Sequence, residues 1–347
     1  MTERIFGTLP DGRAVPIRTL KNQRGVEVDV IAYGGTITRI SMPDRAGRMA
    51  SVALGFDRLE PYLKRHPYFG CIVGRIAGRV TAGRLLVDGT AIQLALNNGK
   101  NHLHGGVVGF DQRLWAMSDV PGTSPTNAVQ LSYTSPHGEE GYPGTVAVVV
   151  TYSLDDTGAL TLDYVATGDR PTPLSLTNHT YFNLAGEGSG RIDDHHLSIA
   201  ADQRVPPLGA EMTLSGKLVP VAGTPADLRR PRRLGDVIPH LDQQHGDNYC
   251  IARDPNPAPI PVAWARDPQS GRTLEVLSTE PALQFYSGVM LDGSCVGPSG
   301  RAYGKHTGFC LESQRYPDGS TRPDLGDIMV RPGRPYHQRT VFRFTIS

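Results

Sequence analysis

Glycine and proline interrupt this chain so often that long helices are excluded. The 347 residues include 40 glycines and 28 prolines, spread along the whole length, and both residue types tend to end regular structure. The segments between them are short and rich in valine, threonine and aromatic residues, which favours strands. Such runs lie at residues 26–30, 145–154, 160–167, 274–278, 283–286 and 340–346.

The strand pattern predicts an all-β fold. Apolar and polar residues alternate in Val341-Phe342-Arg343-Phe344, which is typical of a strand with one buried face. Helical pattern is confined to residues 57–66 and 227–238, and the proline-rich residues 255–261 are interpreted as a loop. We therefore expect one large antiparallel β-sandwich, with residues 1–347 as a single domain.

Composition argues against several classes of partner. Lys and Arg number 35 and Asp and Glu 34, so neither nucleic acid nor an anionic membrane is an expected partner. Four cysteines without a CxxC pair are typical of free thiols in a reducing compartment. The first residues lack the apolar run of a signal peptide, and no stretch reaches the ~20 apolar residues of a membrane helix. A soluble, cytoplasmic protein is expected.

Ionisable residues, and one buried amide, gather in short segments where a β-sandwich does not need them. The residues concerned are Arg75 and Arg79, His102 and His104, His179, Asp247, Gln284, and Glu312. Each has a structural alternative, such as a surface turn or a core histidine. Glu312 is the most informative, because a carboxylate at the end of a buried strand is seldom structural unless it is paired. It is a candidate general base.

Two histidine patterns allow more than one interpretation. His102 and His104 would point to the same face of a strand, as in many metal sites. A metal would need a third ligand, and the surrounding asparagines and glycines fit a sugar-binding loop equally well. His179 stands between Asn178 and Thr180, which could fix the tautomer of its ring by hydrogen bonding.

Together these segments resemble the aldose 1-epimerase (galactose mutarotase) family. The resemblance rests on Asn101-His102-Leu103-His104-Gly105-Gly106, Thr177-Asn178-His179-Thr180-Tyr181-Phe182-Asn183-Leu184, Gly308-Phe309-Cys310-Leu311-Glu312-Ser313-Gln314 and the loop at residues 138–144. These strings follow the family order over nearly the whole chain. The resemblance implies a large β-sandwich of the galactose-mutarotase type. It also implies exchange of the α and β anomers of a free aldose, without a cofactor or metal.

The resemblance also implies a role for each site residue. Glu312 matches the catalytic base and His179 the catalytic acid, while Arg79, His104, Asp247 and Gln284 match residues that contact sugar hydroxyls. Arg75 and His102 match supporting positions. The family usually has Asn where this chain has Gly78, a departure that affects the preferred hydroxyl pattern.

The implied chemistry needs an ionised base beside a protonated acid, and we expect each charge to stabilise the other and to raise the pKa of the histidine. The expected partner is a small aldose (galactose, glucose or a pentose), and the chain is expected to act as a monomer or homodimer. Three alternatives are an epimerase acting on a hexose 6-phosphate, with Arg75 at the phosphate, a glycoside hydrolase or polysaccharide lyase, and a non-catalytic sugar-binding module.

Overall fold

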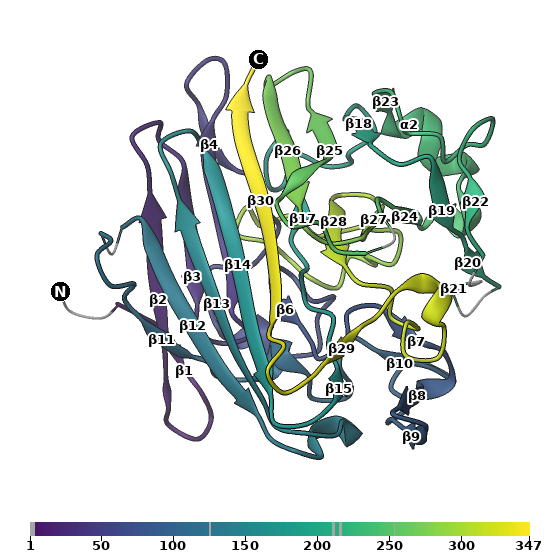
Figure 1. Cartoon of the computed structure of the whole chain (residues 1–347). Helices are drawn as coiled ribbons and strands as arrows, with labels where there is room; N and C mark the ends of the chain where they lie inside the picture. The colour runs from purple at the N-terminus through teal and green to yellow at the C-terminus, as the bar shows by residue number, and fades with distance from the viewer. Residues whose placement is uncertain (1–3, 125, 210–211, 215–216, 253) are drawn as a thin grey trace.

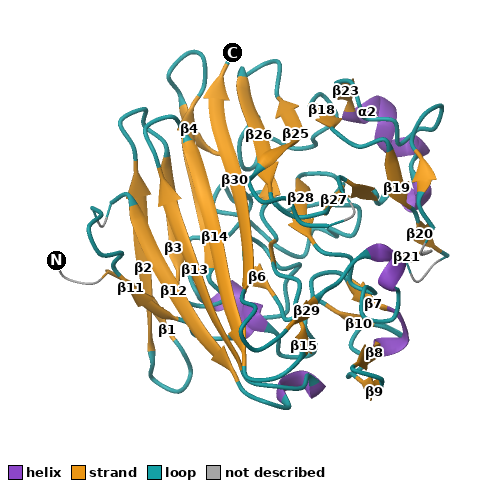
Figure 2. Ribbon diagram, in the orientation of Figure 1, coloured by secondary structure: helices purple, strands orange, loops and turns teal. Residues whose placement is uncertain are grey.

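Long antiparallel strands form most of the molecule (Figures 1 and 2). The computed structural model describes residues 4–347, apart from 125, 210–211, 215–216 and 253. The largest sheet has nine strands, in the order β11 (Ala116–Ser118), β12 (Ala128–Ser135), β13 (Val146–Leu154), β14 (Ala159–Gly168), β30 (Tyr336–Ile346), β26 (Arg272–Ser278), β25 (Ile260–Arg266), β18 (His196–Ile199) and β23 (Arg232–Arg233).

A second sheet shares a core with the first. Its strands are β1 (Arg4–Thr8), β2 (Ala14–Lys21), β3 (Glu27–Ile31), β4 (Thr36–Pro43) and β5 (Met49–Ser51). Val28 and Ile40 from this sheet and Val148 and Leu160 from the nine-stranded sheet belong to one buried apolar cluster. Period-2 alternation places these side chains on the inner faces. The predicted β-sandwich is confirmed, and every predicted strand run coincides with a strand, although β25 starts inside the expected loop.

A six-stranded sheet lies beside the sandwich, on the right of Figure 1. Its order is β17 (Tyr181–Phe182), β28 (Phe309–Gln314), β27 (Ala282–Tyr286), β24 (Asn248–Cys250), β19 (Gln203–Val205) and β22 (Val219–Pro220). All six residues of β28 are buried, so polar side chains on this strand are held in a dry environment.

Short pairs of strands complete the fold around this sheet. They are β6 (Ile72–Val73) with β16 (Thr177–Asn178), β7 (Arg79–Val80) with β10 (His102–Leu103), β8 (Arg84–Val87) with β9 (Thr90–Gln93), β15 (Thr172–Pro173) with β29 (Met329–Val330), and β20 (Pro207–Leu208) with β21 (Thr213–Leu214). The α-helices are single turns, α1 (Glu60–Leu63) and α2 (Leu234–Val237), and lie within the two predicted helical segments. Among the described residues, no helix is long and apolar enough to cross a membrane.

Candidate active site

A cleft of about 460 Å³ opens over the six-stranded sheet. Its walls come from the segment before β6, from β7, from the residue after β10, from the turn between β16 and β17, and from β27 and β28. The lining includes Arg65, His66, Tyr68, Arg79, His104, His179, Tyr181, His245, Gln284, Tyr286, Asp292 and Glu312. Five of the six predicted site residues therefore meet in one cleft, although they are spread over more than two hundred positions of the sequence.

Strand register places three polar side chains in a row on one face of the six-stranded sheet, and two of them, Gln284 and Glu312, line the cleft. Asn248 pairs with Gln284, and Gln284 pairs with Glu312. Side chains of directly paired residues lie on the same face of a sheet. The Gln284 amide donates to the Phe285 carbonyl at 2.6 Å and accepts from the Asn248 amide at 3.5 Å, which fixes its orientation beside Glu312.

His179 is held by its backbone and by a thiol. Its N–H donates to the Cys71 carbonyl at 2.9 Å, and its carbonyl accepts from Gly70 at 3.0 Å. The ring atom Nδ1 lies 3.5 Å from Cys310 Sγ. Asn178 and Thr180 bond to each other and to the backbone, so the prediction that they fix the tautomer of the imidazole is wrong.

His179 and Glu312 form a buried pair. Nε2 of His179 is 3.7 Å from Oε2 of Glu312, and both residues are almost fully buried. Burial raises the pKa of Glu312 to about 8, although Arg79 opposes the shift. Burial lowers the pKa of His179 to about 3. The expectation that the histidine pKa would be raised is therefore wrong, because burial of the imidazole penalises its charged form.

Arg79 and His104 are brought together by the pairing of β7 with β10, in which Leu103 lies opposite Arg79. The Arg79 Nε donates to the Asn98 side chain at 3.0 Å. Nδ1 of His104 accepts the backbone N–H of Gly78 at 3.1 Å. Burial lowers the pKa of His104 well below its ordinary value, so the neutral ring carries its hydrogen on Nε2 and is a donor.

The two predicted supporting residues lie outside the cleft lining. The ring of His102 is bonded to the Ala95 carbonyl at 2.8 Å and to the Tyr142 hydroxyl at 2.6 Å. The expectation that His102 and His104 share a face is wrong, because His104 has a φ of 50° and strand alternation ends before it. The Arg75 guanidinium is buried and bonded to Ser135, Thr172 and backbone carbonyls, which leaves it no free face for a phosphate.

Asp247 differs from the other predicted residues. Its side chain has no exposed surface, forms an ion pair with Arg204 from β19, and is not part of the cleft lining. Burial raises its pKa to about 6, although Arg204 opposes the shift. Two residues earlier, His245 lines the cleft and packs 4.7 Å from the Tyr286 ring. Sequence reasoning missed His245, Tyr68 and Tyr286, because none of them stands in a recognisable motif.

The cluster of His104, His179 and Glu312 has ligand atoms within 4.8 Å of one another, a spacing that a zinc ion could use. The hydrogen bonds do not fit that use. A metal-bound imidazole donates from its second nitrogen to an acceptor, whereas the second nitrogen of His104 receives an N–H from Gly78. The residues present therefore fit a hydroxyl-binding pocket better than a metal site.

Comparisons with known proteins agree with this geometry. The family model for aldose 1-epimerase matches residues 16–343. The galactose mutarotase of Sus scrofa is 42% identical over 100% of this chain and 99% of the relative, and the aldose 1-epimerase of Escherichia coli K12 is 32% identical over 96% of each. The structure of galactose 1-epimerase from Lactobacillus acidophilus matches with a TM-score of 0.84 and 29% identity, over 99% of this chain and 98% of that one. An aldose epimerase homologue from C. elegans has a TM-score of 0.88 and 26% identity, over 96% of this chain and 99% of that one. The chain belongs to the aldose 1-epimerase family.

Proposed function

We propose that this protein interconverts the α and β anomers of a free aldose, that galactose is among its substrates, and that Glu312 and His179 exchange the protons. The observation that carries the assignment is the buried pair itself, with 3.7 Å between Nε2 and Oε2 at the floor of a sugar-sized cleft. Relatives named galactose mutarotase support the choice of sugar.

The reaction requires two proton-transfer groups, which act on two oxygens bonded to the same carbon. Ring opening removes the proton of the C1 hydroxyl and adds a proton to the ring oxygen, which is bonded to the same carbon. A base and an acid must therefore approach one atom from two directions, each within about 3 Å of its oxygen. Glu312 takes the hydroxyl proton and His179 supplies the proton to the ring oxygen. After rotation about C1–C2, closure reverses both transfers, so no group is consumed.

The pair carries one proton through the neutral range. With a Glu312 pKa of about 8 and a His179 pKa of about 3, that proton rests on Glu312 in the free enzyme. Moving it to His179 gives the ionised base and protonated acid without any exchange with solvent. The burial that opposes this charged form also strengthens the interaction of both charges with a bound sugar.

The remaining cleft residues supply a set of hydroxyl partners. Arg79 and His104 are donors, and Gln284 lies beside Glu312 with its amide fixed. His245 has Nδ1 3.3 Å from the Gly246 carbonyl, and burial lowers its pKa to about 4. Nε2 of the neutral His245 ring is therefore an acceptor. A sugar contact for Asp247 stays a prediction, because its carboxylate is engaged by Arg204.

Two structural observations disfavour the competing functions. Arg75, the cation that a phosphate-binding epimerase would use, is saturated by internal hydrogen bonds. Asp247, the carboxylate that a hydrolase would pair with Glu312, is bound to Arg204 outside the cleft lining.

A cytoplasmic location is also proposed. It is supported by the four free cysteines, of which Cys71 and Cys310 are buried and Cys250 and Cys295 half-buried.

Polarimetry of freshly dissolved α-galactose tests the proposal. Glu312→Gln and His179→Asn should each lower the catalysed rate at least about 10²-fold, as expected when general catalysis is lost. Glu275→Gln is the control, because Glu275 on β26 forms an ion pair with Arg343 on β30, and neither residue lines the cleft. A Glu312→Gln variant as active as the Glu275→Gln control would contradict the assigned roles.

A further inference from the structure

Two segments of the active site meet at Ser175, a fully buried residue outside the cleft lining. Ser175 lies between β15 and β16, four residues before His179. Its N–H donates to the Arg75 carbonyl at 2.9 Å, and its carbonyl accepts from Ala77 at 2.8 Å. The backbone of Ser175 therefore joins the segment that carries His179 to the segment that carries Arg79.

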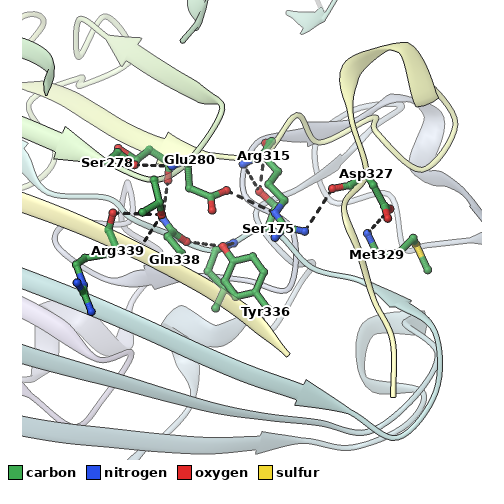
Figure 3. A network of polar contacts seen from close by, with 12 residues as sticks. Ser175, Ser278, Glu280, Arg315, Asp327, Met329, Tyr336, Gln338 and Arg339 are labelled. Atoms are coloured by element: carbon green, nitrogen blue, oxygen red, sulfur yellow. Dashed lines mark hydrogen bonds and ion pairs between the residues drawn. The ribbon is translucent and has the colours of Figure 1, made fainter. Parts of the chain in front are cut away.

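The side chain of Ser175 reaches a third segment. Its hydroxyl accepts the N–H of Arg315 at 3.0 Å and donates to the carbonyl of the same residue at 3.2 Å. Figure 3 shows Ser175 and Arg315 in this network of polar contacts. Arg315 directly follows β28 and is three residues from Glu312, so one hydroxyl links the backbone of the acid to the backbone of the base.

Arg315 is itself fixed on three sides (Figure 3). Its Nη1 donates to the Asp327 carbonyl at 3.3 Å, and its guanidinium carbon lies 4.6 Å from the centre of the Tyr336 ring. Its Nε is 3.6 Å from Oε2 of Glu280, which is fully buried. Neither carboxylate oxygen of Glu280 has a hydrogen-bond partner among the described residues.

Such an ion pair contributes little to stability, because the free-energy cost of desolvating two charges exceeds the Coulombic gain from a long contact without good hydrogen bonds. Its effect is geometric. It restrains the side chain of Arg315, whereas Ser175 bonds to the Arg315 backbone, so the end of β28 has little freedom to shift relative to the segment that carries His179.

We infer that Ser175 is a positioning residue, whose hydroxyl, together with the pairing of β17 and β28, sets the separation between His179 and Glu312. The inference rests on the proposed function of that pair. Acid and base must each lie within about 3 Å of oxygens on a single carbon, and a displacement of 1 Å in such a site can lower the rate about 10²-fold. A residue that joins both backbones controls this displacement without contacting the substrate.

A matched pair of variants tests the inference. Ser175→Ala removes the hydroxyl contacts with the Arg315 backbone and leaves the backbone hydrogen bonds of residue 175 and the pairing of β17 with β28 in place. Ser270→Ala removes an equivalent hydroxyl, which donates to the Leu184 carbonyl at 3.1 Å and accepts from Arg272 at 3.2 Å but lies away from the cleft. Each variant should lose about 1 kcal/mol of unfolding free energy. Under conditions in which both are fully folded, only Ser175→Ala should lower kcat by 10- to 100-fold, with KM changed by less than about threefold.

A second readout separates positioning from general loosening. Ser175→Ala should shift the limbs of the pH–rate profile, because the coupling within the pair depends on its separation, whereas Ser270→Ala should reproduce the wild-type profile. Ser175→Cys retains a weak donor of similar size and should give an intermediate kcat. Equal kcat in Ser175→Ala and Ser270→Ala would overturn the inference while leaving the proposed function intact. An active Glu312→Gln variant would instead refute the proposed roles of the pair.

Discussion

His104 and His245 face the cleft in opposite hydrogen-bonding states. Nδ1 of His104 accepts from Gly78, and Nδ1 of His245 donates to Gly246. The cleft therefore offers a sugar one imidazole donor and one imidazole acceptor, in addition to the Arg79 guanidinium. Sugar hydroxyls both donate and accept, and a mixed set of partners can discriminate between epimers in a way that a set of donors alone cannot.

The first prediction concerns His245. His245→Ala should raise KM for the preferred aldose about three- to tenfold, the equivalent of one neutral hydrogen bond, with little change in kcat. His245→Asn keeps a side-chain acceptor and should recover part of the loss. The measurement is initial-rate polarimetry with galactose and a series of deoxygalactoses. One deoxy sugar should show no difference between wild type and His245→Ala, and a uniform effect on every sugar would argue against a hydrogen bond from a hydroxyl.

The second prediction concerns the proton shared by Glu312 and His179. The pair holds one proton between its two pKa values, about 3 and about 8. The pair gains a second proton below the lower value and loses its only proton above the higher one. The value of kcat/KM should therefore form a plateau that falls above pH 8 and only in strong acid. A rate that declines on the acid side near pH 6.5 would show that a histidine with an ordinary pKa controls activity.

At the scale of elements, the loop that carries His104 depends on close backbone packing. Gly105 has a φ of 87°, and a Cβ at this position would overlap the carbonyl oxygen of Gly74. Gly99, in the turn before β10, has a φ of 61°, but a Cβ there would have no neighbour within 4 Å. Both positions have the left-handed backbone conformation, which favours glycine. At Gly105 the close packing against the segment that precedes Arg79 also requires a residue without a side chain.

These two glycines give the third prediction. Gly99→Ala should cost about 1 kcal/mol of unfolding free energy through backbone strain alone. Gly105→Ala should cost at least twice as much and should also raise KM, because His104 moves with the loop. Chemical denaturation and initial rates measure the two effects. Equal losses of stability in both variants would mean that the loop tolerates separation from Gly74.

The elements also explain which features the sequence could predict. Strands such as β13 and β30 follow from local alternation, which requires no knowledge of partners. The turn at His104 depends on an N–H from Gly78, 26 residues away. The position of the Asp247 side chain depends on Arg204, 43 residues away. Neither long-range contact leaves a pattern in the sequence. The prediction that His102 and His104 share a face is therefore wrong, and the position of the Asp247 side chain could not be predicted. The role expected for the neighbours of His179 is wrong for a similar reason, because Asn178 bonds to the carbonyl of Gly70, 108 residues away.

At the scale of the whole molecule, one apolar cluster joins the two sheets of the sandwich and extends to β27 and β28 through Leu283, Phe285, Phe309 and Leu311. A single domain over residues 1–347 stays a prediction, and this continuity is what such a domain would have. The continuity also means that β28, the strand that carries Glu312, is built into the main core. Ionisable groups on that strand are buried as part of the fold, so their titration affects global stability.

Buried carboxyl groups and buried histidines should both contribute to the dependence of stability on pH. Burial raises the pKa of Glu312 to about 8 and of Glu280 to about 7, from an ordinary value of 4.5. Their protonated forms favour the folded state, so this stability is complete below pH 4.5 and is lost as pH rises through 7 and 8. Burial lowers the pKa of His179 to about 3 and of His245 to about 4, from 6.5. Their stability is complete above pH 6.5 and is lost as pH falls through 4 and 3. The melting temperature should therefore be highest between the ordinary pKa values of the two kinds of group, 4.5 and 6.5.

The last prediction isolates the share of this pH dependence that belongs to Glu312, the proposed base. Gln is neutral and has the shape of Glu, so Glu312→Gln removes the cost of a buried charge without opening a cavity. Near pH 5, where the carboxyl is protonated in the fold, wild type and Glu312→Gln should melt at similar temperatures. Near pH 8.5 the variant should be more stable by on the order of 3 kcal/mol, which is several degrees in Tm. Calorimetry at both pH values measures this difference. The inactive variant would then be the more stable one, as expected when a charge is kept in a dry site for catalysis. Parallel melting curves for the two proteins at every pH would mean that Glu312 is hydrated, and that the raised pKa on which the shared-proton scheme rests is absent.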